Sequence, residues 1–353
     1  MCRFLNKRTE AMTPYVPGEQ PKDKKYIKLN TNESPYPPSE AAIEAIKAAT
    51  NSDLRLYPDP DCMELKETIS DVYGISVKNV FVGNGSDEVL AMAFQAFFES
   101  DRAILFPELT YSFYPVYAEL YGLNYEVVPL DDKFNIPIEK FYGAKGGVII
   151  PNPNAPTGVA LPLCDLEKII SETSEVVVII DEAYVDFGAE SAVGLISKYP
   201  NLLVVQTLSK SRGLAGLRVG YAIGSPELIF GLEKIKNSFN SYTLDRIALA
   251  GAVASIKDIE YNRKIQKKII ATRDMTALRL ADMGFKITDS KANFLFVSPP
   301  DGNASKLFNK LRDEGILVRY FSKTPEWLRI TVGTDEQMIA MLSVIEKWFA
   351  KGV

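Results

Sequence analysis

The segment TLSKSRGLAGLR, residues 207–218, gathers three cationic side chains in a chain whose formal net charge is −5. Lys210, Arg212 and Arg218 stand there among small residues and glycine. Neighbouring positive charge and partial burial lower the pKa of a lysine and free its amine as a nucleophile. An arginine fork binds phosphate through paired hydrogen bonds. The segment therefore predicts a reactive amine beside an anion site, with the part of Arg212 left open.

The absence of histidine narrows the chemistry. It excludes a Ser-His-Asp triad, a Cys-His dyad and a histidine-ligated zinc site. Cys2, Cys62 and Cys164 form no CxxC pair, so neither a metal site nor a disulfide framework is predicted. Acid–base catalysis would then depend on Lys, Tyr, Asp, Glu or Cys, or on a cofactor.

Four polar segments follow or end short apolar runs. GNGSDE follows the run 79–82, NPNAPTG follows 147–150, DEAY follows 176–180, and TLSK follows 202–205. Each has an ordinary explanation as a turn, a helix cap or a solvated lysine. Ligands of an open parallel sheet bind outside the carboxyl ends of its strands. We therefore expect the four segments to meet in one crevice.

The first and last of these segments contain groups that bind phosphate. Gly85, Ser86 and Asp87 would present backbone N–H groups at the start of a helix, where an anion is stabilised. Ser209 and Arg218 would add a hydroxyl and a guanidinium. A nicotinamide-binding turn is the alternative, but the GxGxxG pattern is incomplete here.

A carboxylate and an amine complete the set. Asp181 directly follows the apolar run 176–180, so its charge requires a cationic partner. Lys210 would condense with an aldehyde. A phosphate cup, a carboxylate for a pyridinium nitrogen and a reactive lysine are the groups that pyridoxal 5'-phosphate needs from a protein.

The elements that must position these groups follow from periodicity. Short, apolar, β-branched runs separated by helical stretches predict an α/β fold with a mostly parallel sheet between helices. From about residue 250, long helical sequence leads to a smaller α+β region with a partly antiparallel sheet. We expect an arm (1–40), a large domain (41–250) and a small domain (251–353).

Composition limits the partners and the location. The net charge of −5 argues against a general nucleic-acid binder. No apolar stretch reaches the roughly 18 residues of a membrane-spanning helix. The start MCRFLNKRTE lacks the apolar core of a signal peptide. The sequence predicts a cytoplasmic protein that acts on small molecules, without nucleic acid or membrane as partner.

From about Pro14 to Lys347 the sequence resembles the class I and II pyridoxal-phosphate aminotransferases of fold type I. The motifs that carry the resemblance are TPYVPG, LNTNESPYPPS, RLYPDPD, GNGSDE, NPNAPTG, DEAYVDF, TLSKSRGLAGLRVGY, KANFLFV and LRITVG. The resemblance implies that Lys210 bonds to the cofactor and moves the substrate proton. Asp181 would pair with the ring nitrogen, Tyr184 would bond the ring hydroxyl and Tyr111 would stack on the ring.

The resemblance also implies a phosphate site and a dimer. The residues implied around the phosphate are Gly85, Ser86, Asp87, Thr207, Ser209 and Arg218. Tyr57 would reach a phosphate across the interface of a homodimer, to which the arm would also contribute. One departure concerns the asparagine that often precedes Pro-Thr-Gly in the family. Ala155 stands there, so the cofactor contact falls to Asn154, or to Tyr184 and a water.

The implied reaction transfers an amino group between L-histidinol phosphate and 2-oxoglutarate, giving imidazole-acetol phosphate and L-glutamate in histidine biosynthesis. Arg329 would bind the anionic end of either substrate, with Arg319 and Tyr15 nearby. Three alternatives share parts of this pattern: a broad aromatic amino acid aminotransferase, a threonine-phosphate decarboxylase and a nicotinamide-dependent dehydrogenase. A non-enzymatic binding module would leave Lys210 and Asp181 unexplained.

Overall fold

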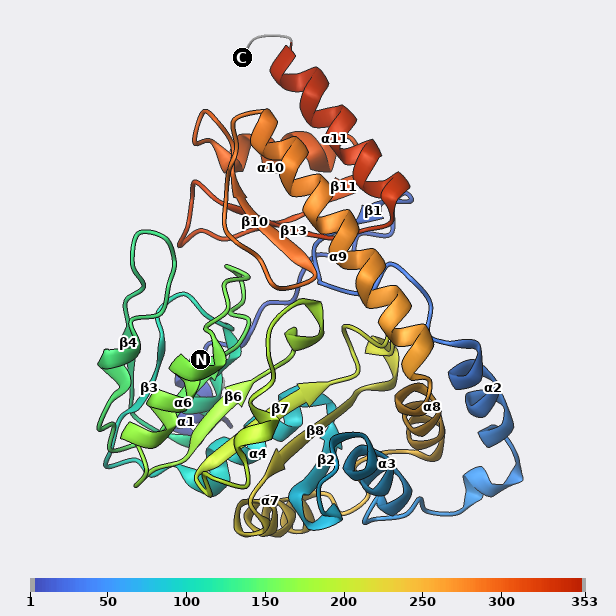
Figure 1. Cartoon of the computed structure of the whole chain (residues 1–353), viewed down its shortest axis with the longest axis vertical. Helices are drawn as coiled ribbons and strands as arrows, with labels where there is room; N and C mark the ends of the chain where they lie inside the picture. The colour runs from blue at the N-terminus through green and yellow to red at the C-terminus, as the bar shows by residue number, and fades with distance from the viewer. Residues whose placement is uncertain (1–3, 351–353) are drawn as a thin grey trace.

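The four apolar runs named above and a fifth at 103–106 form strands of one seven-stranded sheet in the computed structural model, which describes residues 4–350 (Figure 1). The strands of this sheet are β2 (Val80–Asn84), β3 (Ile104–Pro107), β4 (Tyr125–Val128), β5 (Val148–Pro151), β6 (Val178–Asp181), β7 (Leu202–Thr207) and β8 (Val219–Gly224). Their order is β2-β8-β7-β6-β5-β3-β4. β8 runs antiparallel to both neighbours, and the other strands share one direction. Their carboxyl ends therefore lie at one edge.

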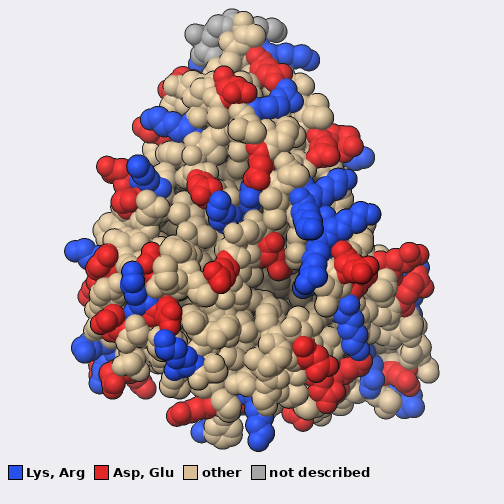
Figure 2. Space-filling view, viewed as in Figure 1, with Lys and Arg blue, Asp and Glu red and all other residues tan. Residues whose placement is uncertain are grey.

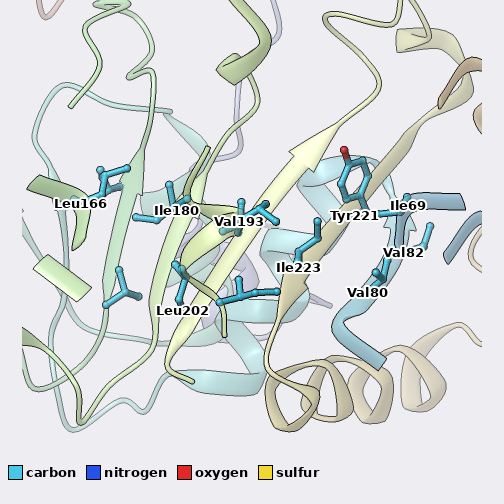
Figure 3. Packing of buried hydrophobic residues seen from close by; sticks show 14 of the residues in the cluster. Ile69, Val80, Val82, Leu166, Ile180, Val193, Leu202, Tyr221 and Ile223 are labelled. Atoms are coloured by element: carbon cyan, nitrogen blue, oxygen red, sulfur yellow. The ribbon is translucent and has the colours of Figure 1, made fainter. Parts of the chain in front are cut away.

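Helices cover both faces of this sheet because alternate strand residues are apolar on each side. Val178 and Ile180 pack in the cluster with α3, α6 and α8, whereas Ile179 packs in the cluster with α4, α5 and α7. Figure 3 shows Leu166 of α6 close to Ile180, and Ile69 of α3 beside β2. The bounds are α3 Met63–Tyr73, α4 Gly85–Phe97, α5 Phe113–Tyr121, α6 Leu163–Glu172, α7 Pro226–Phe239 and α8 Arg246–Lys257. The predicted α/β fold class is confirmed.

In Figure 1 a second body lies above the edge of this sheet at which the parallel strands end. Its four-stranded antiparallel sheet has the order β12-β13-β10-β9 and packs against α9, α10 and α11. β1 pairs in parallel with β11, so the segment before residue 40 contributes to this body. The bounds are β1 Ile27–Lys28, β9 Lys286–Ile287, β10 Phe294–Ser298, β11 Ile316–Leu317, β12 Arg319–Tyr320, β13 Leu328–Thr331, α9 Ile259–Asp282, α10 Ala304–Asp313 and α11 Asp335–Ala350. The domain boundaries at residues 40 and 250 stay a prediction.

The remaining elements are short. They are α1 (Lys7–Ala11), α2 (Glu40–Ala49) and 3-10 turns at Ser52–Arg55, Val77–Asn79, Ile138–Phe141, Val185–Phe187, Ala192–Leu195 and Ala215–Leu217. Cys62 and Cys164 are free thiols, and Cys2 lies outside the described residues. Within residues 4–350, no helix has the length and apolarity to cross a bilayer. Acidic and basic side chains are interspersed over the face in Figure 2.

Candidate active site

One cavity at the carboxyl edge of the sheet collects all four polar segments. The sequence-predicted residues that line it are Ser86, Asp87, Tyr111, Asp181, Tyr184, Thr207, Ser209, Lys210 and Arg218. They come from the ends of β2, β6 and β7, from the segment after β3, and from the residue that precedes β8. The NPNAPTG segment after β5 contributes Pro153 and Ala155. The parallel direction of these strands is what brings them together.

Lys210 and Asp181 face this cavity from neighbouring strands. Asp181 ends β6 and pairs in register with Val205 of β7, and Lys210 lies in the loop that follows β7. The Lys210 Nζ donates to the Thr31 carbonyl oxygen over 3.4 Å. It also lies 5.8 Å from the ring centroid of Tyr184. The lysine amine is therefore held at the cavity by weak contacts and stays available for reaction.

The Asp181 carboxylate is buried, and no cationic side chain of residues 4–350 forms a hydrogen bond with it. Its residue is 5% exposed. The Tyr114 hydroxyl donates to Oδ2 over 2.8 Å, and the Ala183 backbone N–H donates to Oδ1 over 3.2 Å. Burial raises the pKa of Asp181 to about 6, although these hydrogen bonds and the Lys210 charge oppose the shift. A protonated ring nitrogen would supply the positive charge that this carboxylate lacks.

The start of α4 and the Arg218 guanidinium form a cup. Gly85 begins α4 with φ +80°, and a Cβ there would stand 2.5 Å from Arg218 Nη2. Arg218 Nη2 donates to Asp87 Oδ2 over 2.9 Å, and Nη1 donates to Ser209 Oγ over 3.4 Å. The Thr207 hydroxyl donates to Ser209 Oγ over 3.0 Å. Helix N–H groups, two hydroxyls and a guanidinium in one place fit a phosphate.

Two predicted cofactor residues lie away from this cavity in the described chain. Asn154 is buried outside its lining: its Nδ2 donates to the Leu109 carbonyl over 2.9 Å, and its Oδ1 has no partner within residues 4–350. Tyr57 is 77% exposed and stacks on Tyr242 with ring centroids 4.5 Å apart. Asn154 therefore donates elsewhere, and Tyr57 does not line this cavity within the described chain.

The residues predicted for the substrate lie on the second body and the arm. Arg329 on β13 pairs across the sheet with Arg319 on β12. The Arg329 guanidinium stands 5.4 Å and 5.5 Å from the ring centroids of Phe294 and Phe321. Its Nη2 donates to the Asn30 carbonyl over 3.0 Å, whereas its buried Nε has no partner in the described chain. Burial lowers the pKa of Arg329, as expected for a cation without an anion beside it.

A second hollow adjoins the cavity, and Arg329 belongs to the lining of neither. Tyr111 lines both, and Tyr15 and Arg319 line the second hollow. The Tyr15 ring stacks on Phe113 at 4.3 Å, which fixes the arm over this entrance. The Tyr111 hydroxyl donates to Asp87 Oδ1 over 2.7 Å. A substrate in the second hollow would thus lie against a residue of the cofactor cavity.

Comparison with known proteins identifies the family. Residues 24–345 match the family model described as aminotransferase class I and II. The chain belongs to this family. The structure of this aminotransferase resembles the histidinol-phosphate aminotransferase of Sinorhizobium meliloti in complex with pyridoxal-5'-phosphate, with a TM-score of 0.88 and 24% identity over 98% of each chain. A putative histidinol-phosphate aminotransferase from Erwinia carotovora atroseptica gives a TM-score of 0.86 and 25% identity over 92% of this chain and 96% of that one.

Curated relatives share much more sequence with this aminotransferase. The histidinol-phosphate aminotransferase of Clostridium acetobutylicum is 55% identical over 99% of this chain and 100% of its own length. The protein of the same name from a Marinomonas species is 54% identical over 98% of this chain and 99% of its own. Family membership, together with a phosphate cup, a buried carboxylate and a lysine in one cavity, indicates pyridoxal phosphate as the cofactor.

Tyr114 is a site residue that the sequence did not reveal. Its hydroxyl is the side-chain donor to Asp181, and the residue is fully buried on α5. We expect Tyr114→Phe to weaken cofactor binding by about 10- to 100-fold, because a hydrogen bond to a charged group contributes roughly 1.5–3 kcal/mol. Titration of the cofactor-free aminotransferase with pyridoxal phosphate measures this. Tyr117→Phe, on the same helix, is the control, and equal affinities for both variants would contradict the role of Tyr114.

Proposed function

We propose that this aminotransferase converts L-histidinol phosphate and 2-oxoglutarate into imidazole-acetol phosphate and L-glutamate, as a step of histidine biosynthesis. The observation that carries the proposal is the identity of 52–55% with curated proteins named histidinol-phosphate aminotransferase, over nearly the whole of both chains. The cavity and the half-buried Arg329, whose Nε atom is buried, support it, because both substrates are anionic amino or oxo compounds. The reaction takes place in the cytoplasm.

Each residue of the cavity has a defined task in this reaction. Bound pyridoxal phosphate supplies an electrophilic carbonyl and a ring that accepts electrons. Asp181 holds a proton on the ring nitrogen, which lowers the pKa of its own carboxyl through the added charge pair. The Lys210 amine, held beside Tyr184, removes the proton from the substrate Cα. It would deliver this proton to C4′, the cofactor carbon that receives the amino group. The helix start at Gly85 and Arg218 anchor the phosphate.

Arg329 serves both substrates with the same donors. One substrate presents a carboxylate and the other a phosphate, and a guanidinium fork binds either. Its free Nε is buried, so an anion that reaches it gains a strong interaction in a site with little water. Arg319 donates to the carbonyls of Val16 and Pro17 and so ties the arm beside this anion site.

Replacing Arg329 tests this anion site. We expect Arg329→Lys to lower kcat/KM by about 10- to 100-fold for glutamate and for histidinol phosphate alike, since the charge stays but the fork is lost. Steady-state kinetics with both amino donors measure the effect. Arg279→Lys, at a surface ion pair with Glu346, is the control and should leave both values unchanged. A loss for one donor only would show that Arg329 does not serve both.

The complete site is built in a homodimer. Exposed apolar side chains gather where Tyr57 stacks on Tyr242, and the Arg246 Nη2 holds the Tyr57 carbonyl over 2.8 Å. Leu54 and Leu56 beside Tyr57 are also exposed. A second subunit that covers this surface would place Tyr57 at the phosphate of its neighbour. Sedimentation of the purified protein would then give the mass of a dimer.

The substrate is tested by comparing amino donors. We expect kcat/KM for histidinol phosphate, with 2-oxoglutarate as acceptor, to exceed that for phenylalanine by at least about 100-fold, because a phosphate offers the Arg329 guanidinium more negative charge and more acceptor oxygens than a carboxylate does. Glutamate formation measures the rate. Equal rates would instead support a broad aromatic amino acid aminotransferase. Release of carbon dioxide from threonine phosphate would support the decarboxylase alternative.

A further inference from the structure

Buried hydrogen bonds connect β13 with the hydroxyl of Tyr184. Asn32 is 1% exposed, and its Nδ2 donates to the Tyr184 hydroxyl oxygen over 2.9 Å. The Thr331 hydroxyl donates to Asn32 Oδ1 over 3.0 Å, and the Asn32 backbone N–H donates to Thr331 Oγ1 over 3.0 Å. Asn293 Nδ2 donates to the Asn32 carbonyl over 3.0 Å. The Asn32 Nδ2 therefore has an acceptor, and the Asn32 Oδ1 has a donor.

These contacts decide the direction in which the Tyr184 hydroxyl donates. Thr331 Oγ1 accepts a hydrogen bond from the Asn32 backbone N–H, so the Thr331 hydroxyl hydrogen is available for Asn32 Oδ1. If the Asn32 amide were flipped, its NH₂ group would face that hydroxyl hydrogen instead, and two donors would meet. The amide nitrogen can only donate, so the Tyr184 oxygen accepts there. The Tyr184 hydrogen is then free for an acceptor in the cavity that Tyr184 lines.

We propose that Asn32 is a positioning residue that keeps the Tyr184 hydroxyl as a donor to the hydroxyl-bearing side of the cofactor ring. This inference rests on the proposed function, because it requires pyridoxal phosphate in the cavity. It resolves the departure at Ala155. The Asn154 amide donates to the Leu109 carbonyl, so the side chains at 154 and 155 leave the ring contact to Tyr184, and Tyr184 depends on Asn32.

The arrangement also connects the two binding regions. Thr331 stands two residues after Arg329 on β13, so both side chains lie on the same face of that strand. A strand that moves with the substrate's anionic group would move Thr331, and Asn32 with it. Among the described residues, the charged groups that line the cavity with Tyr184 are Asp87 of α4, Asp181 of β6, Lys210 in the loop after β7 and Arg218 before β8. Arg329 of β13 also interacts electrostatically with Tyr184.

The test removes the Asn32 amide and follows the bound cofactor. Asn32 has φ +56°, which glycine adopts without strain, so Asn32→Gly deletes the donor and keeps the backbone. The readout is the pH midpoint at which the visible absorption of bound pyridoxal phosphate changes. A donor favours the deprotonated ring oxygen, so its loss should raise this midpoint by about 0.5–1 unit. Thr331→Ser keeps the hydroxyl and should match the wild-type midpoint.

A double-mutant comparison distinguishes positioning from a general structural effect. In the Tyr184→Phe background, Asn32→Gly should move the midpoint by less than a third of the shift that it causes alone. No shift, or equal shifts in both backgrounds, overturns the inference. If Asn32→Gly does not fold, Asn32→Asp replaces it, because comparing backgrounds cancels the added charge. A wild-type protein that gains no visible band with pyridoxal phosphate would overturn the proposed function itself.

Discussion

Lys210→Ala abolishes turnover and leaves a folded protein. We expect kcat to fall by more than roughly 10³-fold, because the variant loses both the amine that bonds to the cofactor and the base that moves the substrate proton. The fold should persist, since Nζ makes a single hydrogen bond within residues 4–350, the 3.4 Å contact with the Thr31 carbonyl. Single-turnover rates and thermal unfolding of the same preparation measure the two effects.

Replacing a lysine that lies away from the cavity is the control for this experiment. Lys234 is exposed on α7 and contacts the Phe230 ring at 5.6 Å, away from the cavity. Lys234→Ala should keep wild-type turnover and unfolding temperature. The Lys210→Ala protein should still bind pyridoxal phosphate through the cup. The variant should lose the cofactor on dialysis, because no covalent bond holds the cofactor in the cavity. Turnover within 10-fold of wild type would remove Lys210 from the mechanism.

The part of the site that sequence could predict is the part that lies at strand ends. Asp181, Lys210 and the start of α4 each follow a continuous apolar run, and a parallel sheet brings such positions together whatever the rest of the chain does. The sequence did not predict β4 and β8, because neither strand forms a continuous apolar run. β4 has three exposed residues at the sheet edge, and β8 contains glycine at two of its six positions.

Residues that act through contacts distant in sequence could not be found in this way. Tyr114 lies in an aromatic, apolar helix sequence, where burial in the core is the ordinary expectation, and its contact with Asp181 spans 67 residues. Asn32 meets Tyr184 across 152 residues. The available signal for Tyr114 was chemical: a fully buried tyrosine hydroxyl needs a partner. For Asn154, the sequence indicated an amide near the ring, but the Leu109 carbonyl competes for it.

Asp181→Asn separates activity from stability. We expect kcat/KM to fall by roughly 10²- to 10⁴-fold, because an amide cannot hold the proton on the ring nitrogen as a buried carboxylate does. In the cofactor-free protein, burial raises the pKa of Asp181 from 3.8 to about 6. A raised acid pKa means that stability from this group is present below about pH 4 and is lost as pH rises through 6. The difference in the free energy of unfolding, variant minus wild type, should therefore be larger at pH 7 than at pH 4 by roughly 3 kcal/mol.

Glu182→Gln is the control that isolates the cofactor. Glu182 is buried next to Asp181, and burial raises the pKa of its carboxyl to about 7. It accepts from the Ala192 N–H and from Gln206 Nε2, outside the cavity lining. Both variants remove a costly buried charge, but only Asp181→Asn removes the partner of the ring nitrogen. Pyridoxal phosphate should therefore raise the unfolding temperature of wild type and Glu182→Gln strongly, and that of Asp181→Asn weakly. Equal cofactor stabilisation of all three proteins would mean that the buried carboxylate at 181 is structural and does not meet the ring.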